Sequence, residues 1–264
     1  MHPQSIRTAL IISTYNRPAA LHKVLQAVAR QTRLPDIVAI GDDGSTDETR
    51  QLIDRLRPTM PFLLLHEWQE DKGFRPAGAR NKAFAAALKE GAEYFIQIDG
   101  DIVPERHFVA DHLSHARPGQ YIRGYRGRLS KKETDSYLSE EKFRFRHPHN
   151  YKAWQRCVRL PFKIPCQPHK SYVEGCNVSF WAADIRAING YDETFQGWGQ
   201  EDDDLLERLS MAGCQRRDVK YRCCCVHLWH HEEPRDRFKQ NFRHREDNVA
   251  SGNFRTEHGL DQYL

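Results

Sequence analysis

The chain has 264 residues, of which 29% are charged, and its formal net charge at pH 7 is +4. This length accommodates one large domain or two small ones with a substantial hydrophobic core. No apolar run approaches the roughly 20 residues of a membrane-spanning helix. Residues 1–9 are too polar for a secretory signal peptide, so we expect a soluble, cytoplasmic protein.

The first half of the chain alternates short apolar runs with helical patterns. Strands are predicted at residues 9–12, 37–40, 62–65 and 94–98. Helices are predicted after residue 18, with Leu21, Val24, Leu25 and Val28 on one face, after the Ser-x-x-Glu capping box at residues 45–48, and over residues 77–90 with Gly91 as C-cap. This alternation predicts an α/β fold with a mostly parallel central sheet flanked by helices, in a single domain.

Polar side chains follow the predicted strands at the points where those strands end. Ser13 follows the first strand, Asp43 the second, and Asp99 and Asp101 the fourth. Because parallel strands share one carboxyl edge, where ligands of such sheets bind, we expect these residues to lie together. Carboxylates at such an edge can hold Mg²⁺ or Mn²⁺, which would dock a diphosphate, and Gly100 suits close approach by a ligand. The alternative is an ordinary Asp-rich turn.

The predicted helix at residues 77–90 opens with glycine, proline and the cations Arg75, Arg80 and Lys82. A helix N-terminus with basic residues attracts phosphate. A solvated surface helix is the alternative on spacing alone.

The second half is less regular. A strand-like run covers residues 172–180, interrupted by Gly175, and a short helix is predicted at residues 182–188. The acidic residues 201–204 open a further helix, where carboxylates meet the favourable end of the helix dipole. Trp198, between two glycines, offers a flat floor for a sugar ring, and a carboxylate beside it could accept a proton from a sugar hydroxyl.

Seven cysteines, three of them adjacent at positions 223–225, do not suggest a disulfide framework. Residues 221–226 are predicted as a buried strand that uses cysteine as a small apolar residue, in preference to a zinc site with the following histidines. Histidines three residues apart can share a metal, so His227 and His230 are candidates to complete the coordination of Asp101.

Residues 117–170 carry 14 Lys/Arg against 4 Asp/Glu, with aromatic residues interleaved. Such a stretch could contact nucleic acid, an anionic membrane surface or a phosphorylated acceptor. A solvated insertion without a specific partner is the alternative.

In their order, these clusters resemble the inverting nucleotide-sugar glycosyltransferases of the GT-A fold, glycosyltransferase family 2. The resemblance lies in residues 11–18, 41–47, 79–81 and 99–101. Residues 189–195 and 197–204 resemble the carboxy-terminal galactosyltransferase-type module shared by β-1,4-galactosyltransferases and bacterial chondroitin- or hyaluronan-type synthases. One position departs from that pattern, because Gln200 stands where the galactosyltransferases carry glycine.

The resemblance implies a Rossmann-like GT-A domain in which residues 1–116 form the nucleotide-sugar-binding half. Residues 117–264 would form the acceptor-binding and catalytic half of the same domain. The implied roles are catalytic base for Asp202, donor binding for Ser13, Asp43, Arg80, Asp99 and Gly100, acceptor binding for Trp198 and Glu201, and Mn²⁺ or Mg²⁺ binding for Asp101 with His227 or His230.

The expected activity is transfer of a hexose or N-acetylhexosamine from a UDP-sugar to a glycan or lipid-linked acceptor. Surface polysaccharide or lipopolysaccharide synthesis at the inner membrane face is the expected setting, with peripheral membrane contact and no nucleic-acid partner. The alternatives are a retaining GT-A enzyme, a sugar-binding module without turnover, and a non-enzymatic protein that binds an anionic surface or nucleic acid through residues 117–170.

Overall fold

The computed structural model describes residues 6–160, 175–232 and 234–264. Its first half contains β1 (Thr8–Thr14), α1 (Pro18–Val28), β2 (Ile37–Asp42), α2 (Asp47–Leu56), the 3-10 helix η1 (Arg57–Thr59), β3 (Leu63–Trp68), α3 (Pro76–Lys89) and β4 (Tyr94–Asp99). All four predicted strands and all three predicted helices of this half are confirmed.

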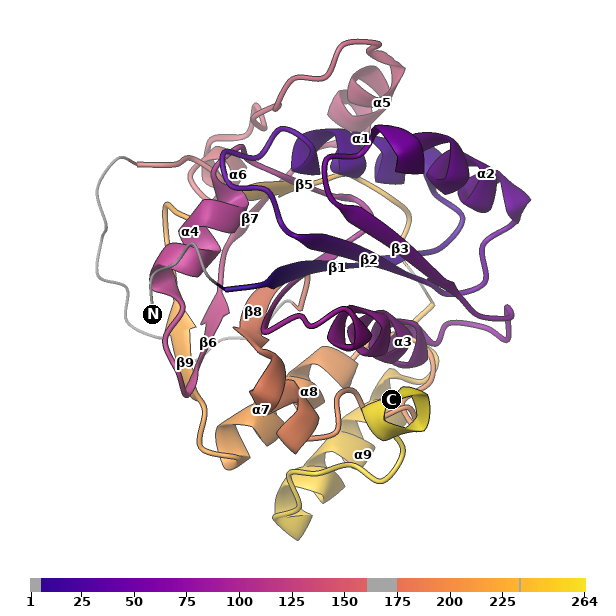
Figure 1. Ribbon diagram of the computed structural model, residues 1–264, viewed down its shortest axis with the longest axis vertical. Helices are drawn as coiled ribbons and strands as arrows, with labels where there is room; N and C mark the ends of the chain where they lie inside the picture. Colours follow the sequence, from indigo (N-terminus) through magenta and orange to yellow (C-terminus); the bar gives the residue numbers. More distant parts are fainter. Residues whose placement is uncertain (1–5, 161–174, 233) are drawn as a thin grey trace.

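The rest of the chain has shorter and more varied elements (Figure 1). They are β5 (Ile102–Pro104), α4 (Phe108–His115), β6 (Gln120–Arg123), β7 (Arg126–Arg128), α5 (Lys131–Ser139), α6 (Tyr151–Trp154), β8 (Asn177–Trp181), α7 (Ala182–Ala187), α8 (Glu201–Met211), β9 (Gln215–Asp218), β10 (Cys225–His227), α9 (Phe238–Ser251) and the 3-10 helix η2 (Leu260–Tyr263). Of the predicted strand at 172–180, residues 172–174 lie outside the described residues.

The described residues form a seven-stranded sheet in the order β3-β2-β1-β4-β8-β6-β9. The pairs among β3, β2, β1 and β4 are parallel, whereas β8 is antiparallel to both β4 and β6. Helices cover both faces, with α1 and α2 on one side and α3, α7 and α8 on the other (Figure 1). Successive side chains of β1 point to opposite faces, so Leu10 packs in the core beneath α1 and Ile11 in the core beneath α3. This is a single α/β domain with a mostly parallel sheet, as predicted.

A small second sheet joins the two halves of the chain at the carboxyl edge of the large one. Its order is β5-β10-β7, and β10 runs antiparallel to β5. In this register His227 lies opposite Ile102, which immediately follows Asp101. The pairing therefore brings a histidine from near the end of the chain beside the Asp99–Asp101 turn.

Two local predictions are wrong. The capping box expected at Ser45 does not form, because Thr46 occupies the N-cap position and the Ser45 hydroxyl accepts a hydrogen bond of 2.8 Å from the Asn16 amide. The strand expected at residues 221–226 is confined to Cys225–His227. Tyr221 and Cys223 have φ angles of +62° and +50°, which are incompatible with an extended strand.

The interpretation of cysteines 223–225 as small buried residues agrees with the structure, since all three are buried and in the thiol form. Burial raises the pKa of each of these thiols. Among the described residues, the group suited to a metal ion contains no cysteine.

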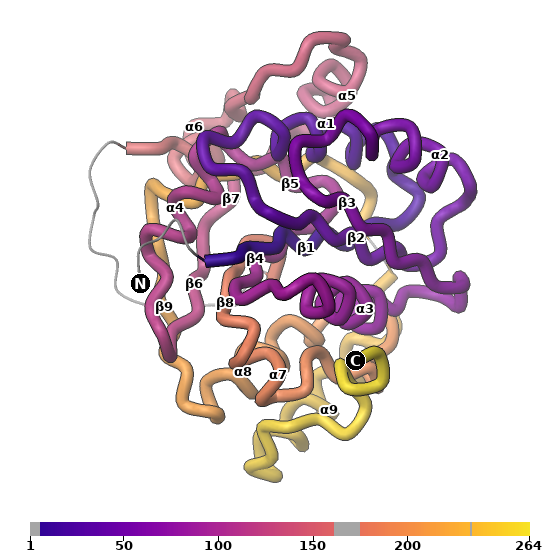
Figure 2. The backbone as a smooth tube through the Cα atoms, in the orientation of Figure 1, coloured from indigo at the N-terminus to yellow at the C-terminus, as the bar shows by residue number. Residues whose placement is uncertain are grey.

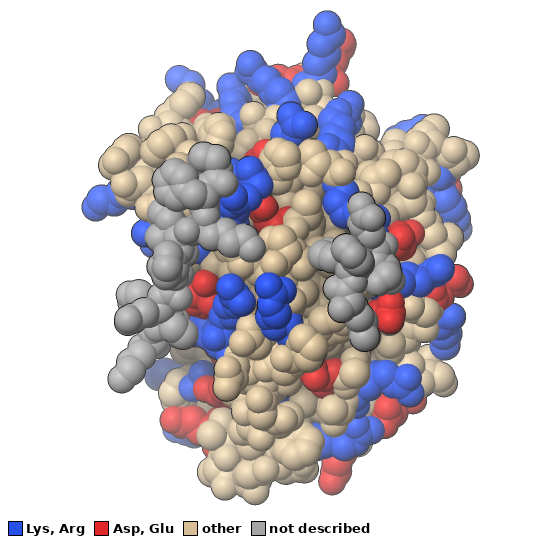
Figure 3. All heavy atoms as spheres, turned by 60° about the vertical axis from the view of Figure 1, so that its left-hand side comes forward, with Lys and Arg blue, Asp and Glu red and all other residues tan. Residues whose placement is uncertain are grey.

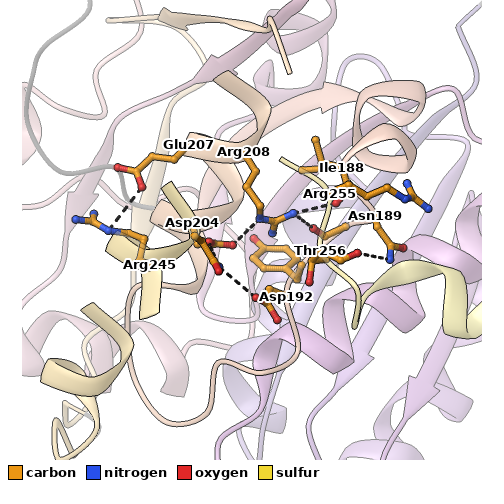
Figure 4. A network of polar contacts seen from close by, with 12 residues as sticks. Ile188, Asn189, Asp192, Asp204, Glu207, Arg208, Arg245, Arg255 and Thr256 are labelled. Carbon is orange, nitrogen blue, oxygen red and sulfur yellow. Dashed lines mark hydrogen bonds and ion pairs between the residues drawn. The ribbon is translucent and has the colours of Figure 1, made fainter. Parts of the chain in front are cut away.

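A buried network of hydrogen bonds and ion pairs connects helices and loops in the second half of the chain (Figure 4). Arg208 of α8 pairs with Asp204 at 2.7 Å and donates to the carbonyl oxygens of Ile188 and Gly190 at 3.0 and 2.9 Å. Asn248 of α9 donates 2.8 Å to the other oxygen of Asp204. These contacts fix α8 against the loop that follows α7 and against α9.

The C-terminal end of the chain lies next to α3, because η2 packs beside that helix (Figure 2). Tyr263 donates a hydrogen bond of 2.9 Å to Glu193, and Lys82 of α3 lies 5.5 Å from the centre of the Tyr263 ring. No helix in the described part of the chain has the length and apolar character needed to cross a membrane.

We predict that Asp204→Ala lowers the free energy of unfolding by about 3–5 kcal/mol, because removing one partner leaves the Arg208 charge buried and uncompensated. Both side chains are at most 2% exposed. Urea unfolding monitored by circular dichroism measures this loss.

Glu207→Ala is the matched control on the same helix. Glu207 is 42% exposed and lies 3.6 Å from Arg245, so we expect a change below about 1 kcal/mol. Equal losses in both variants would contradict the role of the Asp204–Arg208 pair.

Candidate active site

Two strand ends meet where β1 and β4 run side by side. Ser13 pairs with Asp99 in the parallel register, and the Ser13 hydroxyl donates a hydrogen bond of 2.9 Å to Asp99 Oδ1. A Cβ atom at position 100 would lie 2.9 Å from Thr14 Oγ1 and 3.0 Å from Ser13 O, so Gly100 leaves no room for a side chain. Ser13, Asp99 and Gly100 therefore lie together at the carboxyl edge of the sheet.

Asp43 follows β2 at the same edge. Its carboxylate accepts hydrogen bonds of 2.6 Å from Gln69 Nε2 and 2.6 Å from the Arg75 amide. Burial raises the pKa of Asp43, and these two hydrogen bonds oppose that shift. The sequence did not single out Gln69, because its position just after β3 carries no local signal of this contact.

The Arg80 guanidinium joins acidic groups from distant parts of the chain. It lies 3.1 Å from Asp99, 3.1 Å from Asp202 and 3.3 Å from Glu201. The residue is 4% exposed, so the Arg80 guanidinium is enclosed by carboxylates. Burial works against the ionised form of Asp99, but the charges of Arg80 and Arg126 outweigh it and lower the pKa of Asp99.

Asp202 lies in the first turn of α8 with one oxygen held in place. Its Oδ1 atom accepts hydrogen bonds of 2.7 Å from the Tyr191 hydroxyl and 3.1 Å from Arg80. A Cβ atom at Gly175 would lie 2.0 Å from the Asp202 carboxyl carbon, so the glycine makes space for this side chain. Both hydrogen bonds found among the described residues use Oδ1, which leaves Oδ2 for an incoming group.

Tyr191, which the sequence did not identify as a site residue, holds Asp202 in place through its hydroxyl group. Its ring is fully buried, and its hydroxyl accepts a hydrogen bond of 2.6 Å from Gln97 on β4. Burial and the charge of Asp202 raise the pKa of Tyr191, which keeps the phenol protonated as a donor. Asn81 holds the tyrosine backbone at both its amide and its carbonyl. The motifs containing Asn81 and Tyr191 were noted, but their contact is visible only in three dimensions.

The loop before α8 contains an unusual backbone conformation at Gln200. Its φ angle is +80°, in the left-handed region that favours glycine. Glycine is the residue expected here from the resemblance to galactosyltransferases, and in this chain a glutamine adopts the conformation that glycine adopts most easily. The next residue, Glu201, is brought to Arg80 by this turn.

The carboxyl group of Glu201 has an unusually high pKa. Burial raises its pKa to about 7, the charge of Asp202 acts in the same direction, and Arg80 opposes both. The pair Glu201–Asp202 therefore combines a weak acid with a carboxylate that is fixed by two hydrogen bonds.

Trp198 lies in the same loop but points to a different neighbour. Its ring stacks on Phe238 of α9 with 5.8 Å between centroids, and the Arg235 guanidinium lies 4.5 Å from the Trp198 ring centre. Trp198 thus packs against α9, whereas Glu201 forms an ion pair with Arg80.

Asp101, His227 and His230 form a group whose potential ligand atoms lie within 4.8 Å of one another. His227 Nε2 and His230 Nε2 are 3.7 and 3.4 Å from Asp101 Oδ2. Burial lowers the pKa of His227 to about 4 despite the opposing charge of Asp101, so its ring is neutral and can offer a lone pair. The Oδ1 atom of Asp101 is buried without a hydrogen-bond partner among the described residues. This donor set fits a divalent cation such as Mn²⁺.

Arg17, a third residue that the sequence did not single out, lies beside Asp101. Its guanidinium lies 2.5 Å from Asp101 Oδ2 and donates to the Trp229 carbonyl at 3.2 Å. The charge of the Asp101 carboxylate is therefore already compensated by an arginine from the loop after β1.

The basic stretch at residues 117–170 is described as far as residue 160, and much of its charge is paired internally. Arg159 binds the buried Asp111 at 2.9 Å, and Arg144 binds Glu140. Figure 3 shows Lys and Arg in separate groups on the displayed face, with acidic residues between them. The sequence count therefore overstates the cationic surface available to a partner.

The domain gathers acidic side chains at the carboxyl ends of its parallel strands, within the GT-A architecture that its structural neighbours share. The chain belongs to glycosyl transferase family 2, whose family model matches residues 9–168. A second model, described as the N-terminal domain of galactosyltransferase, matches residues 162–232. The predicted family and the galactosyltransferase-type second half are confirmed.

Curated relatives cover most of this chain. Validoxylamine A glucosyltransferase of Streptomyces hygroscopicus subsp. limoneus is 33% identical over 231 residues, an alignment that covers 78% of this chain and 48% of that protein. Chondroitin synthase of Escherichia coli is 24% identical over 256 residues, covering 86% of this chain and 34% of the synthase. The chain thus spans about half the length of the first relative and about a third of the second.

Solved structures share the fold at low sequence identity. S. aureus TarS 1–349 in complex with UDP-GlcNAc has a TM-score of 0.60 at 15% identity, covering 98% of this chain and 69% of that chain. The mannosyltransferase PcManGT from Pyrobaculum calidifontis, in complex with GDP-Man and Mn²⁺, has a TM-score of 0.54 at 18% identity, covering 95% and 64%. Both likenesses confirm the GT-A architecture.

We predict that Glu201 makes stability depend on pH. A carboxyl whose pKa is raised by folding stabilises the protein fully below its unfolded value of 4.5, and this contribution is lost as the pH rises through about 7. Relative to Glu201→Gln, the wild type should therefore lose up to about 3 kcal/mol of unfolding free energy between pH 5 and pH 8. Urea unfolding at a series of pH values measures this difference.

Glu48→Gln provides the control, because Glu48 is exposed in the first turn of α2. The same pH trend in both variants would show that the effect does not belong to Glu201.

Proposed function

We propose that the protein is a divalent-metal-dependent, inverting glycosyltransferase. It moves a hexose or N-acetylhexosamine from a UDP-sugar to a glycan or lipid-linked acceptor in surface polysaccharide or lipopolysaccharide synthesis. The observation that carries this proposal is the Arg80 guanidinium, which lies 3.1 Å from both Asp99 and Asp202. Arg80 thereby holds two residues close together. They are Asp99, at the end of β4 on the proposed donor side, and Asp202, the proposed base from the second half of the chain.

The donor would lie across the ends of β1, β2 and β4. Asp43 would bind the nucleobase, Ser13 the base or ribose, and Asp99 the ribose or the donor sugar. The TarS complex with UDP-GlcNAc supports a UDP-sugar donor for this chain.

Asp101 with His227 and His230 would hold the divalent cation. The orphaned Oδ1 of Asp101 and the neutral ring of His227 support this assignment. A bound Mn²⁺ or Mg²⁺ would neutralise the charge that develops on the departing diphosphate. The Mn²⁺ in the PcManGT complex supports the choice of metal.

Asp202 would act as the general base. Its Oδ2 takes the proton of the acceptor hydroxyl, whose oxygen forms a bond to the anomeric carbon from the face opposite the UDP group. The bond from that carbon to the diphosphate oxygen breaks, and its electron pair leaves with UDP. Tyr191 and Arg80 orient Asp202 through Oδ1, and Trp198 and Glu201 would grip the acceptor sugar.

We predict that Asp202→Asn lowers the rate of sugar transfer by about 10²- to 10⁴-fold, because a general base contributes on that scale. The affinity for UDP should stay within about twofold of wild type. Transfer is measured by UDP release with a panel of UDP-sugars and Mn²⁺, and the anomeric configuration of the product is determined by NMR.

Glu207→Gln on the same helix should keep wild-type transfer. Near-normal transfer by Asp202→Asn would remove Asp202 as the base, and a product that retains the donor configuration would identify a retaining enzyme.

We predict that Asp101→Ala abolishes measurable Mn²⁺ binding and the part of UDP affinity that depends on Mn²⁺, since it removes the carboxylate of the ligand group. Removal of metal by EDTA should reproduce this loss in the wild type. Isothermal titration calorimetry with MnCl₂ and with UDP measures both affinities.

A matched histidine pair tests the rest of the group. His230→Ala should weaken Mn²⁺ binding by at least about tenfold, whereas His231→Ala, outside the group, should not. Equal effects of the two substitutions would contradict the assignment of His230.

A further inference from the structure

A row of stacked rings and guanidinium groups runs from the loop before α8 along one side of α9. Trp198 stacks on Phe238 at 5.8 Å between centroids, and Phe238 stacks on Phe242 at 6.5 Å, with interplanar angles of 28° and 30°. Arg235 lies 4.5 Å from the Trp198 ring and Arg245 lies 4.9 Å from the Phe242 ring. We call these five residues the aromatic strip.

The strip has a fixed position relative to the candidate active site. Asn241, which is 4% exposed, donates hydrogen bonds of 3.1 and 3.0 Å to the carbonyl oxygens of Gln196 and Gly199, on either side of Trp198. Trp198 is four residues from Asp202, so their Cα atoms are at most about 14 Å apart. One end of the strip, at Trp198, therefore lies within this distance of the proposed base.

The strip is partly open to solvent and positively charged. Phe242 is 37% exposed. Between residues 235 and 245 the sequence has five Lys/Arg and a single acidic residue, Asp236. The carboxylate partners of the stacked arginines are Glu232, 2.9 Å from Arg235, and Glu207, 3.6 Å from Arg245. The Arg235–Glu232 pair is exposed on both sides, at 57% and 78%, so it contributes little and an anionic ligand can displace it. Arg245 is 18% exposed and offers a smaller accessible surface.

A guanidinium that stacks on a ring keeps its in-plane N–H groups available for a carboxylate or sulfate. Exposed ring surface at a spacing below 7 Å can support a linear chain of flat, partly apolar units. Acidic groups at Asp236, just before α9, and at Asp247 on α9 make the surface less favourable for a densely charged phosphate polymer or an anionic bilayer. These features together favour an acidic oligosaccharide.

We propose that the aromatic strip binds the part of an acidic glycan acceptor that lies beyond the sugar receiving the new bond. This inference rests on the proposed function, because it supplies the acceptor class for the same site. Trp198 would hold the reacting end, and Phe238 and Phe242 would contact the following sugar units. Arg235 and Arg245 would bind their acidic groups.

Direct binding to the full chain tests this proposal without requiring turnover. The probes are hexasaccharides of galacturonate, hyaluronan and heparin, with maltohexaose as the neutral chain, measured by calorimetry at low salt. We expect at least one acidic hexasaccharide to bind at least tenfold more tightly than maltohexaose. Phe242→Ala and Arg235→Gln should each weaken that binding by about tenfold.

Matched controls separate the strip from general surface effects. Phe254→Ala removes an equally exposed aromatic residue (40%) outside the strip, and Lys239→Gln removes a neighbouring charge on α9. Both variants should bind the acidic probe within about twofold of wild type.

Absence of binding by all three acidic probes would overturn the proposal, as would equal losses in the control variants. Tighter binding of phosphatidylglycerol vesicles or of single-stranded DNA with the same dependence on Phe242 and Arg235 would also overturn it. UDP and Mn²⁺ binding, measured in each variant, tests the proposed function separately, because these ligands do not contact the strip.

Discussion

The arrangement of the candidate active site depends on one buried cation. Asp99, Glu201 and Asp202 could not lie together at low exposure without a positive charge among them, because ionised carboxylates at this separation repel and lose their hydration. Arg80 supplies that charge from α3, and its guanidinium also lies 5.1 Å from the centre of the Tyr191 ring. The same side chain that makes the cluster possible therefore also positions the tyrosine that orients Asp202. Burial, together with the charge of Asp202, raises the pKa of Glu201 by more than Arg80 offsets.

The two aspartates of the Asp99–Asp101 turn serve different neighbours, although one residue separates them. Asp99 closes β4 and points toward Ser13 and Arg80, within the large sheet. Asp101 directly precedes β5 of the small sheet. The antiparallel pairing of β5 with β10 places His227 next to Asp101. A short turn at Gly100 thus divides the carboxylates between an internal ion-pair cluster and a group suited to a cation. Under the proposed function, this division would let an acidic edge accept a negatively charged donor, since Asp99 has a cationic neighbour and Asp101 belongs to the group suited to a cation.

Much of the fold was predictable from local pattern. Strands of a parallel sheet are buried on both faces, so they appear as continuous apolar runs, and the helices between them have a clear apolar face. Parallel strands also end at one edge, which is why Ser13, Asp43 and Asp99 could be placed together before their contacts were known. The local predictions that were wrong, at Ser45 and at residues 221–224, concern hydrogen bonds and backbone angles that a hydrophobic pattern does not encode.

By itself, the sequence determined the order of the strands and helices, the family, and the acidic residues that face the ligand edge. Only the tertiary structure decided which groups compensate those acids. Arg80 and Asp202 are 122 positions apart, and Arg17 reaches Asp101 across a different loop. Tyr191 contacts both Gln97 and Asp202 for the same reason. Such contacts depend on how sheets and helices pack, because spacing along a chain sets the face on which a side chain lies but not the partner it meets there.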